Sequence, residues 1–151
     1  VAKQAGVSKG GLLHHFPNKQ LLITGLFKQM LSSLSEQINT LIEQDSEPAG
    51  CFTRAYLIAV TSSSSKDAFE SRLLGAVSLA MSTETYLANA WAEWVLQEMH
   101  RHQEDANSTQ GQLIRFAADG IWLEACIGGT HSNVQSRDAV IKQLIAMTYQ
   151  I

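Results

Sequence analysis

Residues that interrupt helices or cross-link small folds are scarce in this sequence. Of its 151 residues, only two are proline and two are cysteine. Cys51 and Cys126 lie far apart in apolar, helical surroundings, which predicts buried reduced thiols rather than a disulfide framework. No apolar run approaches the roughly 20 residues that a membrane-spanning helix requires, and the chain starts at Val1 without a secretory signal pattern. We therefore expect a cytoplasmic protein, or an internal fragment of one, with no membrane partner.

The spacing of apolar residues predicts an all-α fold. Such residues make up 45% of the chain and the mean hydropathy is −0.04, values typical of a soluble globular protein. Pro17 and Pro48 stand at the starts of elements, and no run alternates with a period of two for long enough to form a strand. The predicted helices span residues 1–5, 8–15, 19–44, 48–61, 67–82, 83–102, 112–127 and 136–151.

The helix predicted over residues 112–127 is apolar around most of its circumference, so it must be buried on more than one side. The last helix carries an aligned apolar stripe. We expect these two helices to pack as a four-helix interface between two copies of the chain. The predicted interface residues are Ile121, Trp122, Val140, Leu144 and Met147.

Charge is distributed unevenly along the chain. The formal net charge is −3, yet residues 1–35 hold four lysines and no acid, a net of +4. Residues 36–151 hold 7 basic and 14 acidic residues, a net of −7. A basic head on an acidic body favours local attraction of phosphate while the body stays soluble.

The first 16 residues have the pattern of a helix-turn-helix. Small residues stand on the first helix, a glycine stands at the turn, and an apolar plug, an N-cap and apolar anchors follow. These residues are Ala2, Ala5, Gly6, Val7, Ser8, Leu12 and Phe16. The ordinary alternative is a helical hairpin whose turn contains glycine. Two glycines on the free side of the second helix argue against it, because each costs roughly 1 kcal/mol against alanine unless a ligand such as a DNA groove approaches closely.

The run from Ala2 to Lys19 resembles the head of the tetracycline-repressor (TetR) family, A-x-x-A-G-V-S-x-G-x-L-Y-x-H-F-x-S-K. The specific likeness covers about the first 27 residues. Beyond them, only the order of helices and the run 119–124 are similar. Leu13 replaces the usual Tyr, and Asn18 replaces the usual Ser. The family's first helix is missing, so we expect a truncated DNA-binding domain over residues 1–44 and a ligand-binding and dimerisation domain over 45–151.

The resemblance implies a homodimeric repressor that leaves double-stranded operator DNA when a small, largely apolar effector binds. Lys9, Gly10, Gly11 and Leu13 would face base edges. His14, His15 and Lys19 would lie near phosphates, although His15 could instead be packed within the head. An effector cavity would lie among large residues that could equally form core. These residues are Phe52, Tyr56, Phe69, Met81, Tyr86, Trp91 and Trp94.

Two hypotheses of other classes stay open. One is a helical carrier of a lipid or small molecule without DNA binding, and the other is an enzyme on a helical bundle. No Ser/His/Asp, Cys/His or paired-carboxylate arrangement indicates catalysis, so we expect neither an enzyme nor a cofactor. His100 and His102 with nearby acids could hold a metal, but a solvated helix end is the better interpretation.

Overall fold

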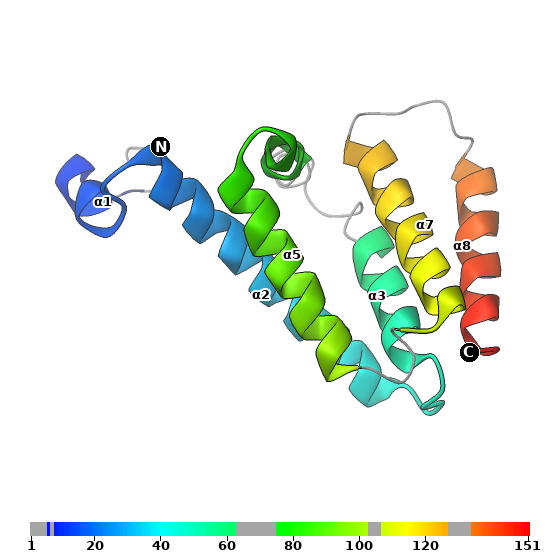
Figure 1. Cartoon of the computed structure of the whole chain (residues 1–151). Helices are drawn as coiled ribbons and strands as arrows, with labels where there is room; N and C mark the ends of the chain where they lie inside the picture. The colour runs from blue at the N-terminus through cyan, green and yellow to red at the C-terminus, as the bar shows by residue number, and fades with distance from the viewer. Residues whose placement is uncertain (1–5, 7, 63–74, 103–106, 127–133) are drawn as a thin grey trace.

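The computed structural model describes residues 6, 8–62, 75–102, 107–126 and 134–151, and every regular element in them is helical (Figure 1). This confirms the all-α prediction. The helix expected over residues 1–5 lies outside the described residues. The elements are α1 (Lys9–His15), α2 (Lys19–Gln44), α3 (Cys51–Ser62), the 3-10 turn η2 (Ala80–Ser82), α5 (Thr85–Arg101), α7 (Thr109–Cys126) and α8 (Val134–Thr148).

Helix α2 begins at Lys19, as predicted, because the residue that caps it is its immediate neighbour in the sequence. The Asn18 side chain accepts a hydrogen bond from the Leu21 amide at 2.8 Å, which satisfies one of the amides that a helix start leaves unpaired. The start of α3 was predicted three residues too early. Residues 48–50 form a turn in which Gly50 has a φ of +68°, and a Cβ there would lie 2.1 Å from the Thr148 carbonyl oxygen. Only glycine fits this contact between the turn and the end of α8.

The helix boundaries in the middle of the chain differ from the predicted ones. Of the helix predicted over 67–82, residues 75–79 are helical and lead into η2, and the rest lies outside the described residues. Helix α7 begins at Thr109, three residues early, because the Ser108 hydroxyl accepts a hydrogen bond from the Gly111 amide at 2.8 Å.

Helix α3 is the centre of the body. Nine of its twelve residues are buried, and α2, α7 and α8 pack around it, while α5 packs on α2 and η2 (Figure 1). The core includes Phe27, Ile38, Leu57, Leu87 and Ile114, each fully buried. Helix α1 and the first turns of α2 project from this body. A binding partner can therefore contact α1 without touching the core.

Candidate nucleic-acid interface and ligand site

Helix α1 is short but capped at both ends. The Ser8 hydroxyl accepts a hydrogen bond from the Gly11 amide at 3.0 Å, and the Phe16 amide donates to the Leu12 carbonyl oxygen at 2.8 Å. A seven-residue helix with two glycines has little intrinsic stability. Its caps and its packing on α2 therefore hold it in place.

The packing on α2 depends on Phe16. A Cβ built on Gly25 of α2 would lie 2.8 Å from Cε1 of Phe16, so the ring fits against a helix surface without a side chain. Leu12 and Phe16 are half-buried, as anchors should be. Gly6 has a φ of +67°, the conformation that the turn before α1 was predicted to need. The other predicted head positions, Ala2, Ala5 and Val7, lie outside the described residues.

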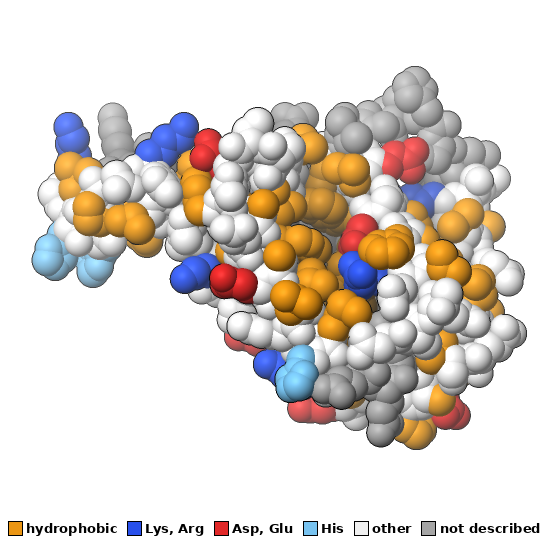
Figure 2. All heavy atoms as spheres, in the orientation of Figure 1, with side chains coloured by type: hydrophobic (Ala, Val, Ile, Leu, Met, Phe, Trp, Pro, Cys, Tyr) orange, Lys and Arg blue, Asp and Glu red, His pale blue; other side chains and the backbone are white. Residues whose placement is uncertain are grey.

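Six of the seven residues that the sequence assigned to DNA lie on α1, and Lys19 is the first residue of α2. All of them are exposed, and α1 has no buried residue. The set is Lys9, Gly10, Gly11, Leu13, His14, His15 and Lys19. His15 is exposed with its ring edge-on to that of His14, at 5.3 Å between centroids, and is therefore not packed within the described head. Figure 2 shows histidine side chains and side chains of lysine or arginine on the projecting end of the molecule.

Gly10 has open space where a side chain would be. A Cβ there would approach only the Ser8 hydroxyl, at 4.0 Å, whereas a Cβ on Gly11 would lie 3.2 Å from the same atom. The packing of the described chain therefore does not require glycine at position 10. Glycine at this position would allow another surface to approach the helix closely from outside.

The predicted pocket residues partly form one aromatic cluster. Phe52 and Tyr56 on α3 and Trp94 on α5 are buried, and Trp91 is half-buried. Ring centroids are 6.2 Å apart for Phe52 and Tyr56, 6.4 Å for Tyr56 and Trp94, and 5.2 Å for Trp91 and Trp94. Met81 and Tyr86 are half-buried against the same core. Phe69 lies outside the described residues.

Large side chains bridge α5 to α3. Helix α5 packs on α2 and η2, and among the described elements its backbone does not pack closely on α3 or α7. The Tyr56–Trp94 contact and the stack of His102 on Phe52, at 4.5 Å, cross this space. These rings fill the space between the two helices.

A polar relay joins this cluster to α2. The Trp94 indole N–H donates to the Ser35 hydroxyl at 2.8 Å, and that hydroxyl donates to Oε1 of Glu98 at 3.0 Å. Glu98 is 3% exposed and also pairs with Arg101 at 3.2 Å. Sequence reasoning missed this relay. Its one available signal was a carboxylate on the apolar face of the helix predicted over 83–102.

A second polar group joins α3 to α7. The Tyr56 hydroxyl donates to Oδ1 of Asp119 at 2.5 Å, and Arg115 lies 3.6 Å from Oδ2. Burial raises the pKa of Asp119, although the hydrogen bond from Tyr56 and the charge of Arg115 oppose the shift. Burial, and then the charge of Asp119, raise the pKa of Tyr56. The phenol therefore stays a donor at neutral pH.

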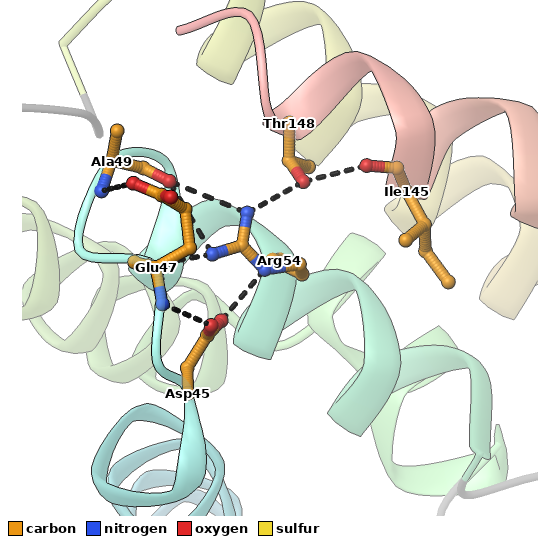
Figure 3. Close-up of polar contacts among 6 residues, drawn as sticks. All are labelled: Asp45, Glu47, Ala49, Arg54, Ile145 and Thr148. Carbon is orange, nitrogen blue, oxygen red and sulfur yellow. Dashed lines mark hydrogen bonds and ion pairs between the residues drawn. The ribbon is translucent and has the colours of Figure 1, made fainter.

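Arg54 fastens the end of α2 to α3 and α8 (Figure 3). Its Nε lies 2.6 Å from Oδ2 of Asp45, Nη1 donates to the Thr148 hydroxyl at 2.9 Å, and Nη2 donates to the Glu47 carbonyl oxygen at 2.8 Å. A hollow of about 260 Å³ lies beside it. None of the predicted pocket residues lines this hollow. Its lining residues are Leu41, Gln44, Asp45, Ser46, Arg54, Ala55, Ile58 and Tyr149. Because Arg54 is already hydrogen-bonded on all three nitrogens, we assign it to structure.

Helix α7 carries an exposed apolar stripe. Leu113 is 59% exposed, Phe116 57% and Leu123 41%, and with Gly120 they follow helical spacing on one face. Of the predicted interface residues, Val140 is 47% exposed. Ile121 is half-buried, and Trp122, Leu144 and Met147 are half-buried against the core of their own chain.

Other predicted features have simple outcomes. Cys51 and Cys126 are reduced and half-buried. Among the residues that the structure describes, no helix is long and apolar enough to cross a membrane, and no cluster of side chains could hold a metal ion. Glu104 and Asp105, the acids considered with His100 and His102, lie outside that part of the chain.

Family models match both ends of this architecture. The model described as "Tetracyclin repressor-like, C-terminal domain" matches residues 50–149, well over half of the chain. The model described as "Bacterial regulatory proteins, tetR family" matches residues 1–26, which include α1. Neither the comparison with curated proteins nor the comparison with solved structures found a match.

Proposed function

Because the chain belongs to the TetR family of bacterial DNA-binding transcriptional regulators, we propose that it is a homodimeric repressor which a small apolar effector releases from its operator. Residues 1–44 form the DNA-binding part and residues 45–151 the ligand-binding and dimerisation part. Two copies of α1 enter successive major grooves of a pseudo-palindromic site. The match of residues 1–26 to the regulatory head disfavours a carrier without DNA binding.

The exposed face of α1 carries this proposal. Helix α1 is capped and carries two glycines. It belongs to a positively charged head, since residues 1–35 have a net charge of +4. Lys9, Gly10, Gly11 and Leu13 are assigned to base edges, where the aliphatic Leu13 suits a thymine methyl group. His14, His15 and Lys19 are assigned to phosphates.

The stripe on α7 supports the dimer. Large apolar residues on one exposed face mark an interaction surface. Gly120 stands in the middle of the stripe, and a Cβ built there meets nothing within 4 Å. Glycine inside a helix costs about 1 kcal/mol against alanine, so a second helix that approaches closely accounts for it. Val140 on α8 extends the same interface.

The relay supports coupling between effector and DNA. Trp94 belongs to the aromatic cluster, whereas Ser35 lies on α2, whose N-terminal end carries α1. An effector that displaces Trp94 breaks its hydrogen bond to α2. It thereby favours a state in which the two α1 helices have the wrong spacing.

Selection of genomic fragments by the intact protein tests the function. We expect enrichment of a palindromic sequence, with an affinity that falls steeply as salt rises because bound lysines release counterions. A reporter gene placed behind that sequence should be silenced by the protein and restored by the effector. Enrichment of no common sequence would contradict DNA recognition, and activation of the reporter would contradict repression alone.

A further inference from the structure

Arg115 on α7 has hydrogen-bonding capacity that the fold leaves unused. Its side chain is only 16% exposed, and its Nε atom is buried without a hydrogen-bond partner. The contact with Asp119 is made through Nη1 at 3.6 Å, which is longer than a hydrogen bond. Within the described chain, the edge formed by Nε and Nη2 therefore has no acceptor. Buried donors without acceptors are rare because they lose their hydration and gain nothing in return.

The guanidinium of Arg115 lies over the Phe116 ring, 4.5 Å from its centroid, and Asp119 connects it to the aromatic cluster. Arg115, Asp119 and Trp122 are spaced by four and three residues on one face of α7, and Asp119 on that face accepts the hydrogen bond of Tyr56. The Tyr56 ring in turn lies 6.4 Å from that of Trp94, between centroids. Figure 2 shows a basic and an acidic side chain together among hydrophobic side chains in the region between α5 and α7.

We propose that the effector carries a carboxylate on an apolar body and that Arg115 binds this carboxylate through Nε and Nη2. The inference rests on the proposed effector site and specifies its chemistry. Two parallel N–H groups match the two oxygens of a carboxylate, and the rings of Tyr56 and Trp94 contact the apolar body. Asp119 holds the guanidinium in place, but its charge weakens the binding of a second anion.

Three ligands of one shape test the ligand class: 2-naphthoate, 2-naphthamide and 2-methylnaphthalene, each titrated calorimetrically into the intact protein without DNA. We expect 2-naphthoate to bind tightest. Arg115→Met should lower its affinity at least tenfold and leave that of 2-methylnaphthalene unchanged. Lys28→Met, at an exposed lysine of α2, is the matched control and should bind like wild type.

Two further variants make the test independent of misfolding. Arg115→Lys keeps the charge but loses the planar pair of donors, so it should bind 2-naphthoate with intermediate affinity. Asp119→Asn keeps an acceptor for Tyr56 and removes the neighbouring negative charge, so it should bind 2-naphthoate several-fold more tightly and 2-naphthamide as wild type does.

Each remaining outcome has a definite meaning. Equal binding of 2-naphthoate by wild type and both Arg115 variants, or no binding by wild type, overturns the carboxylate site. Tight binding of 2-methylnaphthalene with no effect at Arg115 overturns the ligand class while the effector site stands. If 2-naphthoate binds through Arg115 but operator affinity is unchanged at saturation, the carboxylate site stands and the proposed release from DNA fails.

Discussion

At the scale of residues, two pairs of arginine and aspartate side chains differ because their surroundings differ. Arg54 is 4% exposed with acceptors on every nitrogen, whereas Arg115 is 16% exposed and its buried Nε has no acceptor. Asp45 and Asp119 are shifted in opposite directions: the hydrogen bond from Arg54 lowers the pKa of Asp45, and burial raises that of Asp119. Removing a partner from the fully paired Arg54 should therefore destabilise the fold, whereas the unpaired Nε of Arg115 is the group that we propose binds a ligand.

Asp45→Asn should destabilise the protein by about 3 kcal/mol at neutral pH, because it leaves the buried Arg54 guanidinium without its counter-ion. The pKa of Asp45 is lowered on folding. Its contribution to stability is therefore present above its ordinary pKa of 3.8 and is lost as pH falls through the lower, folded value. Urea unfolding at fixed protein concentration should give a smaller difference between wild type and variant at about pH 3 than at about pH 7. An equal difference at both pH values would show that the ion pair does not stabilise the fold.

At the scale of elements, sequence patterns predicted what local chemistry determines. Ser8 and Asn18 cap helices through neighbours three residues away, so α1 and α2 could be placed from the sequence, and the exposed DNA-facing residues followed from them. The relay through Ser35, the clamp at Arg54 and the unused edge of Arg115 could not be placed. Each depends on which face of one helix meets which face of another, and single-sequence periodicity leaves that undetermined. On α2, for example, Leu26 is 36% exposed whereas the neighbouring Phe27 is fully buried.

Ser35→Ala tests how α2 and α5 are joined. The change leaves the Trp94 indole N–H without an acceptor and removes one donor from the buried Glu98. We expect a loss of about 1–3 kcal/mol in the free energy of unfolding, together with faster amide hydrogen exchange in α5. Ser33→Ala, at an exposed serine two residues away on the same helix, should stay within about 0.5 kcal/mol of wild type. Equal effects of the two substitutions would mean that the hydrogen bonds of Ser35 do not stabilise the packing of α5 on α2.

At the scale of the whole molecule, the proposed function depends on two surfaces at opposite ends of the fold: the face of α1 and the stripe on α7. Figure 1 places α1 at one end of the long helix α2, and α7 and α8 beyond α3 at the other side of the body. A dimer formed through α7 and α8 leaves both α1 helices outside the interface. It can therefore set their spacing without covering them.

Leu113→Glu should separate the dimer and leave the folded protomer intact, because residue 113 is 59% exposed in one chain and would be buried only in the proposed dimer. An unpaired charge at such an interface costs several kcal/mol, about a hundredfold or more in the dissociation constant. Leu96→Glu, at a 67% exposed leucine on α5, is the control and should remain a dimer in sedimentation at micromolar concentration. Trp122→Glu is a poorer test, since Trp122 packs against its own core and its loss would unfold the chain. A wild-type monomer would contradict the interface.

The most direct test of DNA recognition through α1 is the affinity of Gly10→Leu for the operator selected with wild-type protein. Leucine is a better helix former than glycine by roughly 0.8 kcal/mol, and a Cβ at this position clashes with nothing in the described chain. The head should therefore stay folded and become slightly more stable. A bulky side chain on the outward face should hold α1 away from the floor of the groove, so specific binding should fall at least a hundredfold while weak, salt-sensitive binding to any DNA persists. Operator affinity equal to that of wild type would contradict the assignment of α1 as the helix that reads DNA.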